Sequence, residues 1–162
     1  MSDSSQNSVE RVLILDDEEM VLTSLRSFLE LETDYEVVTF TSATEALEYT
    51  KKNKINLVVS DYLMPEMDGI SFLAKVKEID PNATRIILTG YADKENAIKA
   101  INEVSLFQYI EKPWDNDNLK LVIRNGIDKQ KLLSELESKV VEIKKAYGDL
   151  ENLHVDILKA FA

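Results

Sequence analysis

Short apolar segments alternate with helical patterns over most of the chain. Apolar residues dominate residues 12–15, 37–40, 57–61, 86–88 and 107–110, which predicts five buried strands. Between them, apolar residues recur every three or four positions, which predicts helices at residues 20–31, 43–49, 70–79 and 93–104. Strands that alternate with helices in this way form a mostly parallel sheet covered on both faces. We therefore expect a doubly wound α/β fold with a five-stranded parallel sheet.

A different pattern follows the last predicted strand. A long helical stretch begins near residues 115–118, and from Leu133 apolar positions alternate at spacings of three and four, as in a coiled coil. The seam consists of Leu133, Leu136, Val140, Ile143, Tyr147, Leu150, His154, Ile157 and Phe161. A lone amphipathic helix is marginal in water, so the seam needs a partner. We expect a parallel homodimer through residues 133–161; the alternatives are a helix folded back on its own domain or packed on a missing one.

Two glycines bear on the continuity of this helix. Gly126 and Gly148 each disfavour a helix by about 1 kcal/mol relative to alanine. The pair Asn125-Gly126 is also a plausible helix C-cap. One continuous helix and two successive helices both fit the sequence.

Composition narrows the class of protein. The chain has 162 residues, 44% of them hydrophobic, no cysteine, four glycines and a formal net charge of −11. The absence of cysteine excludes a disulfide framework, and the acidic balance argues against a nucleic-acid surface. No apolar run approaches the roughly 20 residues of a membrane span. Residues 1–8 are polar, which predicts a disordered tail without a signal peptide, so we expect a cytoplasmic location.

Charged and hydroxyl side chains follow four of the predicted strands. Asp16 and Asp17 follow the first strand, Asp61 ends the third, Thr89 the fourth, and Lys112 follows the fifth. Ligands of such sheets bind beyond the carboxyl ends of the strands, so these side chains should converge. Carboxylates that share a small site need either a cation or raised pKa values, and if a cation binds, hard oxygens select magnesium, manganese or calcium. Magnesium, a lysine and a hydroxyl around a carboxylate suit phosphoryl transfer, in which the carboxylate can be the nucleophile.

These motifs resemble the receiver (CheY-like) domain of bacterial two-component response regulators. The resemblance covers about residues 9–125 and rests on Asp16-Asp17, on the segment from Asp61 to Gly69 (DYLMPEMDG), on Thr89, and on the segment YIEKP that contains Lys112. It implies a flavodoxin-like sheet of strand order 2-1-3-4-5. It also implies a Mg²⁺ cofactor, with Mn²⁺ possible, and a sensor histidine kinase or phosphotransfer protein as partner. Such a domain phosphorylates itself and turns over no other substrate, so we do not expect an enzyme.

The resemblance also implies a role for each site residue. Asp61 would accept the phosphoryl group. Asp17, Asp61 and the backbone carbonyl of Leu63 would bind the metal directly, and Asp16 would bind it through water or shape the site.

Three further residues would respond to the phosphoryl group. Lys112, placed by a cis bond to Pro113, would pair with it. Thr89 would move to hydrogen-bond it, and Tyr109 would rotate inward as Thr89 moves. Trp114 is expected to pack beneath the start of the last helix, and contact with a partner is the alternative.

Two positions are expected to set the lifetime of the phosphorylated state. Leu63 lies two residues beyond Asp61, and Tyr91 lies two beyond Thr89. Both side chains are large and neither is acidic, so they would screen an acyl phosphate from water. We expect slower self-dephosphorylation than in the variant that carries Leu63→Asn and Tyr91→Glu.

These patterns predict three parts: a tail at residues 1–8, a receiver domain at 9–126, and a coiled-coil linker helix at 127–162. The helical pattern runs to the last residue, so we expect truncation before an output domain, to which the helix relays the signal. His154 is interpreted as a polar seam residue, because the acidic residue that directly follows a kinase phosphohistidine is missing.

Two other functions fit parts of the pattern. A phosphatase of the haloacid dehalogenase type also uses an aspartyl nucleophile, but it needs Asp-x-Asp after the first strand, where this chain has adjacent aspartates. A flavodoxin-like cofactor binder needs a phosphate loop rich in Ser, Thr or Gly at the same place. Here four carboxylates occupy that loop and would repel phosphate without a metal.

Overall fold

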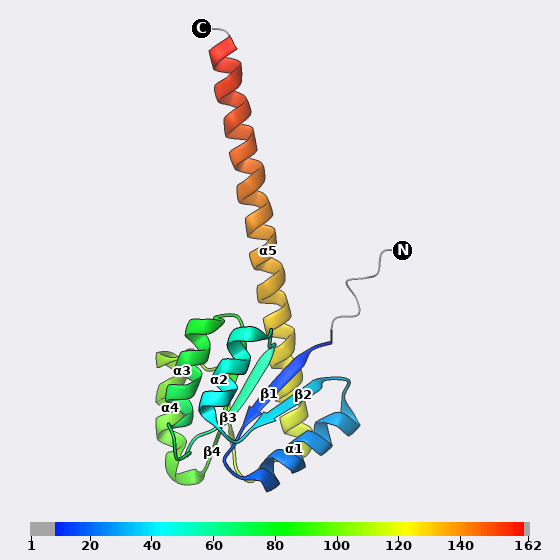
Figure 1. Ribbon diagram of the computed structural model, residues 1–162, viewed down its shortest axis with the longest axis vertical. Coiled ribbons are helices and arrows are strands. Elements are labelled where there is room, and N and C mark those ends of the chain that lie inside the picture. Colours follow the sequence, from blue (N-terminus) through cyan, green and yellow to red (C-terminus); the bar gives the residue numbers. More distant parts are fainter. Residues whose placement is uncertain (1–8, 161–162) are drawn as a thin grey trace. The chain divides into compact units, whose positions relative to one another are not determined.

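The computed structural model describes residues 9–160, with side chains as far as Leu153. Along the sequence the chain divides into two compact units, and the boundary lies between Gln130 and Lys131. The first unit holds five parallel strands: β1 (Arg11–Leu15), β2 (Glu36–Phe40), β3 (Leu57–Asp61), β4 (Thr84–Thr89) and β5 (Gln108–Glu111). Their order in the sheet is β2-β1-β3-β4-β5, which confirms the predicted doubly wound fold (Figure 1).

Helices cover both faces of this sheet, as predicted. They are α1 (Glu19–Glu32), α2 (Ala43–Lys52), α3 (Gly69–Ile79), α4 (Lys94–Glu103) and α5 (Asn116–Ala160). Helix α1 and the first turns of α5 pack on one face, and α2, α3 and α4 pack on the other (Figure 1). Alternate residues of β1 serve the two cores: Val12 and Ile14 face α1 and α5, whereas Leu13 and Leu15 face the other helices. Both faces are apolar, which explains the continuous apolar runs.

Side-chain caps stand at the start of two of these helices. Ser42 caps α2 by accepting a hydrogen bond from the backbone N–H of Glu45 at 3.3 Å, and Asp68 caps α3 by accepting one from that of Ser71 at 2.7 Å. Strand β5 lies one residue later than predicted. A short 3₁₀ helix, η2 (Tyr91–Asp93), precedes α4 and was not predicted.

Helix α5 runs without interruption through Gly126, which decides between the two arrangements that the sequence left open. The hydroxyl of Thr84 donates a hydrogen bond to the carbonyl of Gly126 at 2.7 Å. A Cβ at this position would approach Leu57 and Thr84 to 2.7 and 3.0 Å. Glycine is therefore used here for close packing against the sheet, and the expected C-cap does not form.

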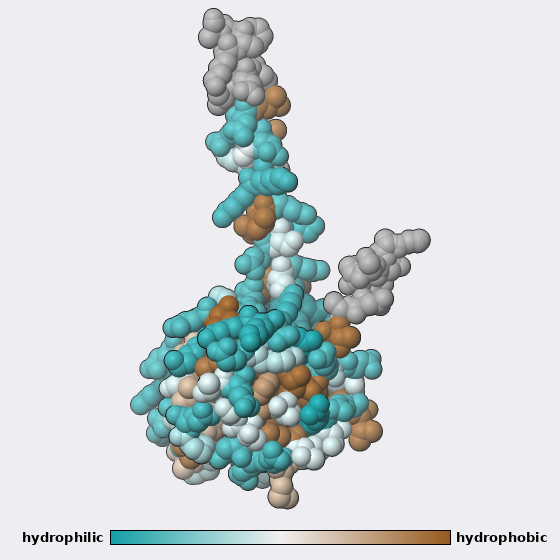
Figure 2. Space-filling view, in the orientation of Figure 1, coloured by the Kyte–Doolittle hydropathy of each residue, from teal (hydrophilic) through white to brown (hydrophobic). Residues whose placement is uncertain are grey.

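The second unit is the remainder of α5. Its apolar seam residues Leu136, Val140, Ile143, Tyr147 and Leu150 are exposed, and apolar side chains lie among polar ones along it (Figure 2). The side chains of seam positions His154, Ile157 and Phe161 lie outside the described residues. Among the helices of residues 9–160, none has an apolar stretch long enough to cross a membrane.

Candidate functional site

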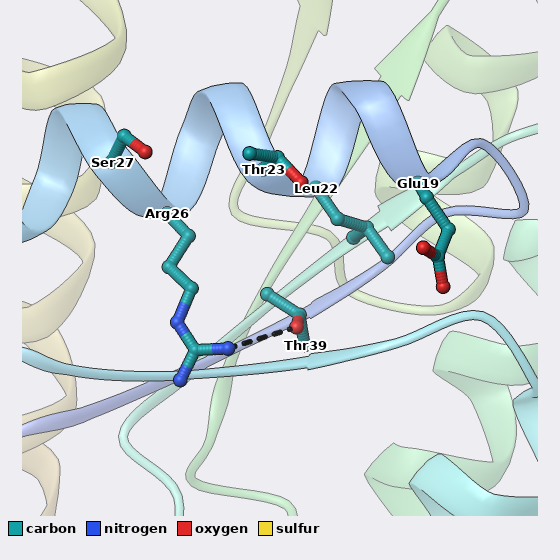
Figure 3. A pocket seen from close by; sticks show the side chains of 6 residues that line it. All are labelled: Glu19, Leu22, Thr23, Arg26, Ser27 and Thr39. Atoms are coloured by element: carbon teal, nitrogen blue, oxygen red, sulfur yellow. Dashed lines mark hydrogen bonds between the residues drawn. The ribbon is translucent and has the colours of Figure 1, made fainter.

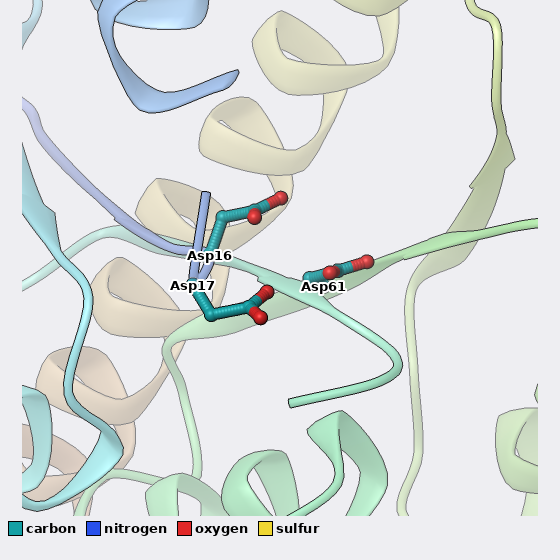
Figure 4. A group of neighbouring side chains, drawn as sticks. All are labelled: Asp16, Asp17 and Asp61. Atoms are coloured by element: carbon teal, nitrogen blue, oxygen red, sulfur yellow. The ribbon is translucent and has the colours of Figure 1, made fainter. Parts of the chain in front are cut away.

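Three carboxylates meet at the carboxyl ends of β1 and β3. Asp16 and Asp17 directly follow β1, and Asp61 is the last residue of β3. One carboxylate oxygen from each lies within 4.8 Å of the other two (Figure 4). Asp16 is completely buried and Asp61 is 7% exposed, whereas Asp17 is exposed to solvent. The strand ends thus bring together the carboxylates that the sequence analysis singled out.

Lys112 supplies the positive charge of this site. Its Nζ donates a hydrogen bond to Oδ1 of Asp61 at 2.8 Å and lies 3.7 Å from Oδ2 of Asp16. The Lys112-Pro113 peptide bond is cis, as the family resemblance implied. The backbone N–H of Lys112 also donates to the carbonyl of Thr89 at 2.9 Å, which ties the loop after β5 to the end of β4.

The electrostatics of the site follow from burial and charge. The pKa of Asp16 is raised to about 6, chiefly because burial disfavours its charged form. A hydrogen bond from Glu18 N–H and the charge of Lys112 oppose this rise, and the carboxylates of Asp61 and Asp17 add to it. Burial alone lowers the pKa of Lys112, but its hydrogen bond to Asp61 and the charges of Asp61 and Asp16 raise it on balance.

The structure places Thr89, Tyr109 and Trp114 in three different surroundings. Thr89 is buried at the end of β4, and its hydroxyl donates to the carbonyl of Gly90 at 3.1 Å. Tyr109 is half-buried in β5 and packs with the core under α2, α3 and α4. Trp114 is half-buried in the opposite core, where α1 and α5 pack, in agreement with its predicted structural role.

A hollow of about 250 Å³ opens beside the carboxylates. It is lined by Asp17, Glu18, Asp61, Tyr62, Leu63, Gly90, Asp93 and Lys112. Asp93 was not predicted to be there; η2 brings it to the site, and no sequence pattern announced that turn. Leu63 lines the hollow and is 62% exposed, whereas Tyr91 is 84% exposed and is not a lining residue. The predicted effect of these two on phosphoryl lifetime stays a prediction.

The donor set fits a divalent cation with hard oxygen ligands. Three carboxylates surround a small space, and among the described side chains they form ion pairs with one lysine, Lys112. Within the described side chains, Oδ2 of Asp16 is buried and accepts no hydrogen bond. A buried carboxylate oxygen without a partner is costly unless a cation or water satisfies it. The acidic triad is therefore suited to Mg²⁺ or a similar ion.

A second hollow, of about 260 Å³, lies between α1 and β2 (Figure 3). Its lining consists of Glu19, Leu22, Thr23, Arg26, Ser27 and Thr39. The guanidinium of Arg26 is already engaged by Glu30 at 2.8 Å and by Thr39 at 3.5 Å. The lining brings together no group comparable to the acidic triad, and we assign it no ligand.

Comparison with known proteins places this site in a family. Residues 12–124 match the response regulator receiver domain. The chain is 32% identical over 142 residues to the hydrogenase transcriptional regulatory protein HoxA of Bradyrhizobium diazoefficiens, a match that covers 88% of this chain and 29% of HoxA. The chain thus spans less than a third of the length of that relative.

Solved structures support the same family. A response regulator receiver domain protein from Clostridium thermocellum superposes with a TM-score of 0.72 at 38% identity, covering 77% of this chain and 99% of that one. The beryllofluoride-activated NtrC4 receiver domain dimer superposes with a TM-score of 0.69 at 32% identity, covering 74% and 98%. The matched family is a regulatory module of two-component signalling and not a catalytic enzyme. This chain therefore belongs to the response regulator receiver family, and a long C-terminal helix follows its receiver domain.

Proposed function

We propose that this chain accepts a phosphoryl group on Asp61 from a phosphohistidine of a sensor kinase or a phosphotransfer protein. The observation that carries the proposal is the ion pair of Lys112 with Asp61 at 2.8 Å, beside two further carboxylates at the strand ends. In the transfer, a carboxylate oxygen of Asp61 forms a bond to phosphorus as the bond from phosphorus to the histidine nitrogen breaks. The electron pair of that bond stays on the nitrogen, and because the other ring nitrogen keeps its proton, the histidine is left as a neutral imidazole.

Each side chain has a task in this step. Asp17, Asp61 and the carbonyl of Leu63 would hold Mg²⁺ or Mn²⁺ directly, and Asp16 would contact it through water. The bound cation would offset the negative charge of the carboxylates and of the incoming phosphoryl oxygens. Lys112 would exchange its contact with Asp61 for one with a phosphoryl oxygen.

The switch would follow from the same event. The hydroxyl of Thr89 now donates to the nearby carbonyl of Gly90, so it would turn to donate to the phosphoryl group. The space that Thr89 vacates would admit the ring of Tyr109, half-buried on the neighbouring strand. The movements of Thr89 and Tyr109 would thus change the surface at the edge of the sheet when Asp61 is phosphorylated.

The C-terminal helix would carry the signal onward. The proposed organisation is a receiver at residues 9–126 and a linker helix at 127–162 that dimerises through residues 133–161 and leads to an output domain or partner. Support comes from the unbroken helix α5 and from its exposed apolar seam. A cytoplasmic location belongs to the same proposal, because a sensor kinase presents its phosphohistidine there.

Incubation with acetyl phosphate and Mg²⁺, followed by measurement of the intact mass, tests the phosphoacceptor. The wild type should gain one phosphoryl group, whereas Asp61→Asn should gain none because the nucleophile is gone. Asp68→Asn, which alters an exposed carboxylate on the same loop, is the matched control and should still be phosphorylated. A wild-type protein that gains no mass, or an Asp61→Asn variant that still gains it, would refute the proposal.

A further inference from the structure

The loop after the phosphoacceptor strand is fastened at both of its ends. This loop, residues 62–68, joins Asp61 to α3 and carries Leu63, whose carbonyl is a proposed metal ligand. At its base the backbone N–H of Gly69 donates to the carbonyl of Tyr62 at 2.8 Å. A methyl group on Gly69 would overlap the carbonyl oxygen of Asp61, so only glycine lets the loop close this tightly. The two ends of the loop therefore lie against the end of β3.

The middle of the loop is fastened to a different part of the chain. The carboxylate of Glu66 reaches the first turn of α2: Oε1 accepts a hydrogen bond from the backbone N–H of Ala43 and Oε2 accepts one from the hydroxyl of Thr44, both at 2.9 Å. The hydrogen bonds from Thr44 and Ala43, together with one from the side chain of Ser42, lower the pKa of Glu66 below its usual value, which favours the ionised carboxylate. Ala43 is 2% exposed and belongs to the core, so the far end of this contact is rigid.

The other contacts of the loop leave its backbone less constrained. Met64 and Met67 are partly buried against the same core. Methionine side chains are flexible and adapt to several backbone positions, so they pack the loop against the core without fixing the exact position of its backbone. The two-pronged contact of Glu66 with α2 has a defined geometry, because both carboxylate oxygens are engaged by separate donors.

We propose that Glu66 is a positioning residue for the metal site, which holds the carbonyl of Leu63 in place by fastening this loop to α2. The inference rests on the proposed function and adds a residue to it. A flexible oxygen site binds a divalent cation more weakly than a rigid one, because binding must first order the ligands. Loss of the contact should therefore weaken metal binding, although Glu66 itself touches no metal.

Isothermal titration with MgCl₂ is the direct test, performed on the full chain. Glu66→Ala should bind Mg²⁺ about tenfold more weakly than the wild type, in line with the effect of losing residues that orient metal ligands. Glu66→Gln should lie between them, since its amide oxygen still accepts from Ala43. Phosphorylation by acetyl phosphate adds a second readout: Glu66→Ala should need more Mg²⁺ for half-maximal rate but reach the wild-type rate at saturation.

Two further variants separate positioning from simple stabilisation of α2. Glu45→Ala removes an exposed carboxylate from the same helical turn; within the described residues that side chain makes no hydrogen bond to the loop, so Mg²⁺ affinity should be unchanged. In the double variant of Thr44→Val and Glu66→Ala, the Thr44 substitution should add little to the effect of Glu66→Ala, because the carboxylate that the Thr44 hydroxyl contacts is already gone.

The possible results distinguish the inference from the proposed function. The role of Glu66 would be overturned if Glu66→Ala bound Mg²⁺ as tightly as the wild type, or if Glu45→Ala lost as much Mg²⁺ affinity as Glu66→Ala. Neither result would affect the proposed function. A wild-type chain that binds no Mg²⁺ and gains no phosphoryl group would overturn the proposed function together with this inference.

Discussion

At the scale of a single residue, the burial of Asp16 couples metal binding to stability. The side chain is completely buried, one of its oxygens has no hydrogen-bond partner among the described residues, and its pKa is raised to about 6. Lys112 lies 3.7 Å away and only partly compensates its charge. Such an arrangement costs stability in the metal-free protein, and the cost is relieved when a cation enters. Binding and stability are thus coupled at this residue.

The pH dependence of unfolding should reveal this cost. Because the pKa of Asp16 in the folded chain, about 6, exceeds the ordinary value of 3.8, the folded state binds more protons between these values. The destabilisation therefore grows as pH rises from about 4 to 6 and is complete above that. In the presence of chelator, Asp16→Asn should stabilise the protein at pH 7.5 by on the order of 2 kcal/mol and by much less at pH 4.5.

Urea unfolding at the two pH values is the appropriate measurement. Asp34→Asn, which removes a charge from an exposed position, is the control and should have a small effect at both. A gain from Asp16→Asn that is as large at pH 4.5 as at pH 7.5 would contradict the assignment, because it would show that the titration of Asp16 does not matter.

At the scale of an element, two glycines in α5 have opposite effects on stability. Gly126 and Gly148 both lie inside this helix. A Cβ at Gly126 would press on Leu57 and Thr84, whereas at Gly148 nothing lies within 4 Å. The first glycine lets the helix approach the sheet closely, and the second brings no contact that compensates for its poor helix propensity.

Alanine substitutions at these two glycines should therefore differ in sign. Gly148→Ala should raise the helix content seen by circular dichroism, since alanine favours a helix by about 1 kcal/mol. Gly126→Ala gains the same propensity but overpacks the core at a cost of about 1–3 kcal/mol, so a net loss in the free energy of unfolding is expected. Urea unfolding followed by circular dichroism measures both, and a stabilised Gly126→Ala would refute the packing explanation.

At the scale of the whole molecule, the charge is distributed unevenly. Up to Gly126 there are 23 acidic and 13 basic residues, and beyond it there are 7 and 6. The first part is strongly acidic, and the acidic triad contributes to this. The second part is nearly neutral and exposes an apolar seam, as expected of a helix that packs against another copy of itself.

The proposed dimer depends on this seam and not on exposed apolar area in general. Ile143 lies in the seam and is 66% exposed, whereas Val141 lies outside it and is 62% exposed. Ile143→Lys should weaken self-association by on the order of 100-fold, because two buried isoleucines are lost per dimer. Val141→Lys should leave it nearly unchanged.

Sedimentation at micromolar concentration, with and without acetyl phosphate, measures the association. Equal effects of the two lysine substitutions would show that the seam is not the interface. A wild-type protein that stays monomeric in both states would contradict the dimer itself.

The sequence alone determined the order of the elements, the parallel sheet and the residues of the acidic triad. A strand buried on both faces needs an apolar run, and the carboxyl ends of parallel strands lie together, so Asp16, Asp17, Asp61 and Lys112 could be placed at one edge from local patterns. The motifs at these strand ends also identified the family.

Only the tertiary structure decided features that depend on contacts between distant residues. The contact of Glu66 with α2 joins segments more than 20 residues apart, and no periodicity announces it. The burial of Asp16 and the turn that brings Asp93 to the site depend on how whole elements pack. The continuity of α5 through Gly126 was settled by Leu57 and Thr84, because close packing against the sheet outweighs the weak local preference of glycine for ending a helix.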